Sequence, residues 1–197
     1  KICGLNTAEA MAAALEAGAD FVGLVAVAAS PRFVPPDVAE RLAGQARGRT
    51  RIVLLSADAE PAELDAWVRA VRPDLVQLHG TEPPQEITRL RAVHGVGVIR
   101  AVGVRTAEDL EGLDRLEALA DHLLLDARPP AGADRTGGHG VAFDWSTLDG
   151  ARFDKPWFLA GGLNPSNVAE AVRRTGAPLT DVSSGVERAP GVKDPAL

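Results

Sequence analysis

The sequence predicts a single (β/α)8 barrel, the TIM-barrel fold, over residues 1–197. Eight short apolar runs alternate with longer stretches of helical period, and they follow one another at roughly 20 to 35 residues, the length of one βαβ unit. Most runs are continuously apolar, as in parallel strands that are covered on both faces. No linker divides the chain. The predicted strands are residues 1–3, 21–25, 51–55, 75–78, 98–102, 122–125, 157–160 and 179–182.

The main alternative architecture is an open, doubly wound sheet. Such sheets often bind dinucleotides through a G-x-G-x-x-G motif after the first strand, and this chain has no such motif there. The barrel is therefore favoured. Since 197 residues is below the roughly 250 usual for the fold, its helices and loops must be short.

Helix boundaries follow from capping residues and prolines. Asn6 and Thr7 can cap a helix over residues 8–17, which ends at Gly18. Thr106 can cap the helix that follows the fifth strand. Four prolines fall near the first turn of a predicted helix, where the missing N–H costs nothing: Pro36, Pro61, Pro83 and Pro165.

Composition narrows the function. The formal net charge of −6 argues against nucleic acid as the main partner. A single cysteine excludes an internal disulfide, and the four histidines show no metal-ligand spacing, so we expect no metal site. The apolar runs are too short for a bilayer and no export signal is visible, which predicts a cytoplasmic protein. The sequence leaves open whether it is a monomer or a homodimer. Because Lys1 already lies in an apolar stretch, a few native residues, including the initiator Met, are expected to precede it.

Reactive side chains fall at the carboxyl ends of the predicted strands, where barrel enzymes place their active sites. Cys3 ends the first strand and Asp126 the sixth, while Arg32, His79 and Asp181 belong to the second, fourth and eighth units. Partial burial favours the protonated form of a carboxyl, as a general acid requires, and a thiol of modestly lowered pKa can act as a base. From the residues alone, the thiol could equally be a small buried hydrophobe and the carboxylate a loop cap.

Two glycine-containing loops follow the seventh and eighth strands. Glycines let backbone N–H groups approach an anion closely, and a phosphate held by these two loops recurs among barrel enzymes. The alternative is a pair of tight turns that merely require glycine. The predicted phosphate-binding residues are Gly161, Gly162, Ser183, Ser184 and Gly185.

Eight motifs, taken in order, resemble those of the phosphoribosylanthranilate isomerase family of tryptophan biosynthesis, and the likeness spans essentially the whole chain. The motifs are KICG (1–4), SPRFV (30–34), QLHG (77–80), LLLDA (123–127), FDW (143–145), LAGGLNPSNV (159–168), DVSSGVE (181–187) and GVKDP (191–195).

The resemblance implies an Amadori rearrangement of N-(5′-phosphoribosyl)anthranilate to 1-(2-carboxyphenylamino)-1-deoxyribulose 5-phosphate, an aldose–ketose type isomerisation without a cofactor. In the family, the residue matching Asp126 is the general acid and the one matching Cys3 the general base. Arg32 would face the anthranilate carboxylate, and His79 and Asp181 would line the pocket. The two glycine loops would hold the phosphate.

Three segments depart from the family pattern and bear on loop closure and affinity rather than on the reaction class. The long loop at residues 127–141 carries a few extra residues, and His139, Val141 and Ala142 stand before FDW where the family usually has polar residues. Thr81 stands where QLHG is normally followed by an acidic residue, and residues 25–29 are aliphatic rather than aromatic or basic. A loop of such length is usually functional or mobile.

Two other functions remain open at this point. One is a phosphate-binding barrel enzyme of the indole-glycerol-phosphate synthase type, whose chemistry depends on lysines at strand ends. We do not expect Lys1, Lys155 or Lys193 to be placed there. The other is a barrel that binds a phosphorylated ligand without catalysis, which the presence of both Cys3 and Asp126 disfavours.

Overall fold

The computed structural model describes residues 1–127 and 145–197 and forms a parallel sheet of eight strands in sequential order, joined by a two-stranded antiparallel hairpin. Each of the eight predicted runs overlaps one observed strand. The strands are β1 (Ile2–Cys3), β2 (Phe21–Val25), β3 (Arg51–Ser56), β4 (Leu75–Leu78), β5 (Gly97–Val104), β6 (His122–Ala127), β7 (Phe158–Leu159), β8 (Leu179–Thr180), β9 (Glu187–Ala189) and β10 (Val192–Lys193).

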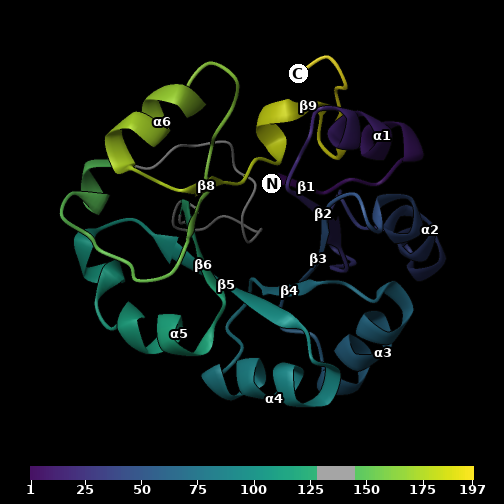
Figure 1. Cartoon of the computed structure of the whole chain (residues 1–197), viewed down its shortest axis with the longest axis horizontal. Coiled ribbons are helices and arrows are strands. Elements are labelled where there is room, and N and C mark those ends of the chain that lie inside the picture. The colour runs from purple at the N-terminus through teal and green to yellow at the C-terminus, as the bar shows by residue number, and fades with distance from the viewer. Residues whose placement is uncertain (128–144) are drawn as a thin grey trace.

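The sheet closes on itself between β8 and β1. Ile2 forms a parallel bridge with Val182, the Cys3 N–H donates to the Val182 carbonyl at 2.8 Å, and the Val182 N–H donates to the Lys1 carbonyl at 3.0 Å. In Figure 1 the strands form a ring with the helices outside it, and the two chain ends lie on the same side of that ring. The predicted TIM barrel is therefore confirmed.

Helices follow most of the strands, but not all. The α-helices are α1 (Ala8–Glu16), α2 (Pro36–Ala46), α3 (Pro61–Val71), α4 (Pro84–His94), α5 (Leu113–Leu119) and α6 (Val168–Thr175). The 3₁₀ helices are η1 (Ala107–Leu110), η2 (Trp145–Leu148) and η3 (Ser184–Val186). In the described ranges, the units after β6 and β8 thus contain only a 3₁₀ turn.

Capping confirms the first helix and corrects two others. The Thr7 hydroxyl accepts a hydrogen bond from the Ala10 N–H at 3.1 Å, so α1 begins where its sequence predicts. Thr106 caps η1 through a capping box, and α5 begins only after Gly112. Pro165 lies in the turn before α6, because the residue that precedes the helix is Asn167. Local capping chemistry serves a 3₁₀ turn as well as an α-helix, which explains the misassignment.

Two apolar layers hold the barrel together. One lies between the helices and the strands. The other fills the barrel interior and includes Phe21 and Phe158, whose rings meet edge to face at 5.1 Å between centroids. Since both residues begin their strands, the apolar plug occupies the amino-terminal half, and polar side chains are left for the carboxyl end. No helix in the described part of the chain is both long and apolar enough to cross a membrane.

Candidate active site

The five predicted catalytic and pocket residues all belong to the carboxyl end of the barrel, since parallel strands end together. Cys3 is the last residue of β1, and Asp126 is the penultimate residue of β6. His79 directly follows β4, Asp181 directly follows β8, and Arg32 lies in the loop after β2. Asp126 and His79 form one cluster, and Cys3, Asp181 and Arg32 belong to another.

The Cys3 thiol lies deeper than its place at a strand end suggests. The residue is 4% exposed, and a side chain at Gly23 on the neighbouring strand would collide with its sulfur. Gly4, with φ of +78°, turns the chain beneath the Arg32 side chain. Burial raises the pKa of the Cys3 thiol, only partly offset by Lys1 and Lys193. Desolvation is the largest effect on this thiol, so its net pKa shift is upward.

Two lysines, Lys1 and Lys193, also reach this end of the barrel, contrary to expectation. Lys1 has a fully buried side chain, and its Nζ lies 2.9 Å from Asp181 Oδ1. Burial lowers the pKa of this ammonium group, but the Asp181 carboxylate and Cys3 outweigh burial, so the net shift is upward and Lys1 stays charged. Lys155 behaves as expected, because it donates to the carbonyls of Glu117 and Ala120 at the end of α5, away from the site.

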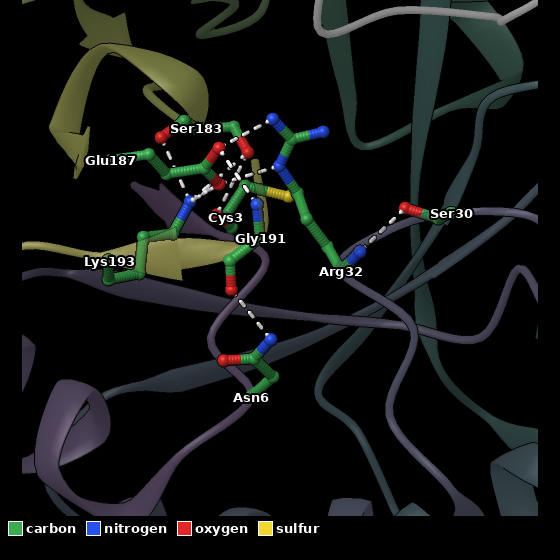
Figure 2. A network of polar contacts seen from close by, with 8 residues as sticks. All are labelled: Cys3, Asn6, Ser30, Arg32, Ser183, Glu187, Gly191 and Lys193. Atoms are coloured by element: carbon green, nitrogen blue, oxygen red, sulfur yellow. Dashed lines mark hydrogen bonds and ion pairs between the residues drawn. The ribbon is translucent and has the colours of Figure 1, made fainter. Parts of the chain in front are cut away.

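The C-terminal hairpin adds residues that the sequence reasoning missed. Glu187 in β9 accepts hydrogen bonds from Arg32 and from Lys193 in β10, its partner across the hairpin. The Lys193 ammonium also donates to the Ser183 carbonyl at 2.8 Å. Figure 2 shows these side chains converging beside Cys3. The last two motifs, DVSSGVE and GVKDP, contain Glu187 and Lys193. The sequence could not show that these two residues pair with each other or with Arg32.

A second polar group links Asp126 to His79 and, through His79, to Gln77. The imidazole Nε2 of His79 lies 3.3 Å from Asp126 Oδ2, and its Nδ1 lies 2.8 Å from the amide nitrogen of Gln77. Gln77 is completely buried in β4, and its side-chain oxygen has no partner among the described residues. The QLHG motif thus supplies an amide that orients the imidazole beside the proposed acid.

The two predicted phosphate loops touch each other. A side chain at Gly185, in η3, would overlap the carbonyl oxygen of Leu163 in the loop after β7. Gly161 and Gly162 have φ of +84° and +66°, and their N–H groups have no acceptor among the described residues. The Asn167 amide donates to the Gly162 carbonyl at 3.0 Å and fixes this loop.

The remaining two predicted phosphate residues connect these loops to β1. The Ser183 hydroxyl donates to the Cys3 carbonyl at 3.1 Å, and Ser184 begins the η3 turn. The loop after β8 therefore contacts Cys3, the proposed base, through the backbone carbonyl of that residue.

Several other candidates lie elsewhere. The loop at residues 127–141, apart from its first residue, falls outside the described residues, as do His139 and the start of the FDW motif. Thr81, which departs from the family pattern, donates its N–H and its hydroxyl to the Asp58 carboxylate in the loop after β3. The described residues contain no group of three or more histidine, cysteine or carboxylate side chains that could hold a metal.

A family model and a sequence relative both match this chain over its full length. The family model for N-(5′-phosphoribosyl)anthranilate (PRA) isomerase matches residues 1–197. A protein of that name from Rhizobium meliloti (strain 1021) is 48% identical over 197 residues, which cover 100% of this chain and 92% of the relative.

Solved structures agree with this match. The crystal structure of phosphoribosyl anthranilate isomerase from Thermotoga maritima has a TM-score of 0.86 at 34% identity, covering 99% of this chain and 92% of that one. A phosphoribosyl anthranilate isomerase in complex with reduced 1-(o-carboxyphenylamino)-1-deoxyribulose 5-phosphate has a TM-score of 0.83 at 33% identity, covering 99% and 91%.

Proposed function

Because the chain belongs to the N-(5′-phosphoribosyl)anthranilate isomerase family, we propose that it rearranges N-(5′-phosphoribosyl)anthranilate with Asp126 as general acid and Cys3 as general base. The observation that carries the proposal is the placement of these two groups. They come from β6 and β1, on either side of β7 and β8, whose loops contain the glycines. A sugar bound by its phosphate at those loops would lie between acid and base.

The first step opens the ribose ring. Asp126 gives its proton to the ring oxygen, the bond from C1′ to that oxygen breaks, and the lone pair of the anthranilate nitrogen forms a C=N bond to C1′. The substrate becomes a protonated imine with a free hydroxyl. The His79 imidazole, at 3.3 Å from Asp126, is placed to orient this carboxyl during the transfer.

The second step removes the proton at C2′. The Cys3 thiolate forms the S–H bond, and the electron pair of the C–H bond becomes the C1′=C2′ double bond while the imine nitrogen is neutralised. The resulting enolamine tautomerises to the ketone. No redox partner or cofactor is needed, because all bonding electrons stay within the substrate.

Recognition would use the two ends of the substrate. The phosphate would lie against the N–H groups of Gly161 and Gly162 and the turn at Ser183, Ser184 and Gly185. The anthranilate carboxylate would face Arg32, whose side chain is 13% exposed and also pairs with Glu187. Since the reaction needs a reduced thiol, a reducing compartment such as the cytoplasm suits this enzyme.

Activity of two variants tests the proposal. With phosphoribosylanthranilate as substrate, Asp126→Asn and Cys3→Ala should each lower kcat by about 10²-fold or more, the usual scale for a general acid or base. Turnover at the parental rate in either variant would remove that residue from its role. Fluorescence of the anthranilate moiety follows the reaction, and a protein that only binds the ligand would leave that signal unchanged over time.

Complementation tests the substrate independently. The gene should restore growth of a tryptophan auxotroph that lacks this isomerase. A parallel strain lacking the analogous isomerase of histidine biosynthesis asks whether a second aminoaldose is accepted. Failure in the first strain, with the protein expressed and folded, would contradict the proposed function.

A further inference from the structure

The ion pairs around Cys3 do not balance in charge. Among the residues that the structure describes, three cations, Lys1, Arg32 and Lys193, are paired with two carboxylates, Asp181 and Glu187. None of the five side chains is more than 13% exposed. A buried group of this kind carries one surplus positive charge, which is costly in an apolar surrounding unless an anion joins it.

Cys3 is the ionisable group placed to supply that anion. The cations come from separate segments of the chain. Lys1 lies directly before β1 and two residues before Cys3, Arg32 packs over Gly4, and Lys193 belongs to β10. Residues two apart in extended backbone share a face, and both Lys1 and Cys3 are buried. The two groups act on each other electrostatically: the Lys1 ammonium favours the thiolate, and the thiolate favours the ammonium.

We propose that Lys1 is a positioning residue of this active site, whose buried ammonium group, held by Asp181, supplies the charge that lets Cys3 exist as a thiolate. The inference rests on the proposed role of Cys3 as the base. It adds a requirement that the family mechanism stated above does not contain: the base must have a neighbouring cation that water cannot screen. When the thiolate takes the C2′ proton it becomes neutral, and the group again has one surplus positive charge. When the thiol later loses that proton, the thiolate again offsets this charge.

The three groups act on the thiol with different signs. Burial raises the pKa of Cys3, and Lys1 exerts the largest opposing effect, followed by a smaller upward effect of Asp181 and a downward one of Lys193. Removing Lys1 should therefore raise the pKa of the Cys3 thiol, and removing Asp181 should lower it. A pair that merely braces the fold would shift it in the same direction, or not at all, because either variant breaks the same contact.

The test is a titration of the thiolate by its ultraviolet absorbance, without substrate. The chain has one cysteine, so the signal belongs to Cys3 alone. In Lys1→Met the pKa of Cys3 should rise by about 1 unit or more, the scale for loss of a nearby opposite charge. In Asp181→Asn it should fall. The control is Lys155→Met, whose ammonium caps α5, and which should match the parent protein.

The double variant guards against misfolding, since Lys1→Met alone leaves a carboxylate unpaired. Lys1→Met/Asp181→Asn removes both charges, and the pKa of Cys3 in this double variant should be higher than in Asp181→Asn. Equal titration in those two proteins, or an unchanged thiol in Lys1→Met, would overturn the inference. Failure of the proposed function is a separate result, because it would appear as full activity in Cys3→Ala while the titrations stay as expected.

The pH profile of kcat/KM provides the second readout. If the thiolate is the reacting form, the acid limb of the profile should move to higher pH in Lys1→Met by the same amount as the titration. KM at high pH should change little, because Lys1 acts through Cys3. A loss of activity that is equal at every pH would contradict the charge role.

Discussion

The Arg32 guanidinium and the Glu187 carboxylate form a two-point ion pair, with Nε 2.7 Å from one carboxylate oxygen and Nη2 2.8 Å from the other. This geometry fixes the plane of the guanidinium. It also joins the loop after β2 to the C-terminal hairpin, so the last residues of the chain determine where Arg32 points.

Arg32→Ala should therefore raise KM far more than it lowers kcat. The anthranilate carboxylate is remote from the bonds that change, so its contact is made equally in the ground and transition states. A charged hydrogen bond of about 1.5–3 kcal/mol corresponds to roughly a 10- to 100-fold rise in KM. Steady-state kinetics on phosphoribosylanthranilate measure it. In Arg32→Lys, which keeps the charge but loses the two-point hydrogen bonding of the guanidinium, KM should lie between those of the parent and of Arg32→Ala. A large fall in kcat at constant KM would contradict the assignment.

Glu187→Gln should destabilise the fold. The Glu187 carboxylate is 4% exposed and serves both Arg32 and Lys193, so its loss leaves two buried cations short of a partner. Breaking a buried pair in this way costs about 3 kcal/mol or more, measurable by urea unfolding at neutral pH. Asp37→Asn is the control, because its pair with Arg41 is exposed and should contribute little.

The pH dependence of that difference has a definite sign. Burial alone would raise the pKa of Glu187, but hydrogen bonds from Arg32 and Lys193 outweigh burial and lower it below its ordinary 4.5. The stabilising contribution is therefore complete above pH 4.5 and is lost as pH falls through the lower folded value. Unfolding of the parent and of Glu187→Gln should converge in acid. A difference that persists unchanged there would show that the carboxylate charge is not the source.

The sequence predicted the strands and the acid–base candidates because both depend on local pattern. Continuous apolar runs identify strands covered on both faces, and a reactive residue after such a run belongs to the barrel mouth. The state of Cys3 could not be predicted, because it depends on the Arg32 side chain above Gly4 and on buried lysines. Lys193 reaches the site only because the hairpin folds back over β1, a tertiary event without a local signal.

Gly185→Ala should weaken phosphate binding. A methyl group there would overlap the Leu163 carbonyl and force apart the two loops proposed to hold the phosphate. We expect KM to rise about tenfold or more and inhibition by inorganic phosphate to weaken in parallel, since charged hydrogen bonds are lost. Gly44→Ala is the matched control, because its added methyl group meets open space on α2 and favours the helix. Parental KM in Gly185→Ala would exclude a phosphate role for this turn.

Gln77→Leu should lower kcat through His79 without changing KM. The side chain is buried and close in volume to leucine, so the fold should tolerate the change, but the imidazole loses the amide at 2.8 Å that sets its orientation. We expect kcat to fall about tenfold, the size of one hydrogen bond of about 1.4 kcal/mol. Gln45→Leu, on the outer helix α2, is the control. Since Gln77 acts only through His79, its substitution should have no further effect in a His79→Ala background. Additive losses in the double variant would show that Gln77 acts on the substrate by a separate route.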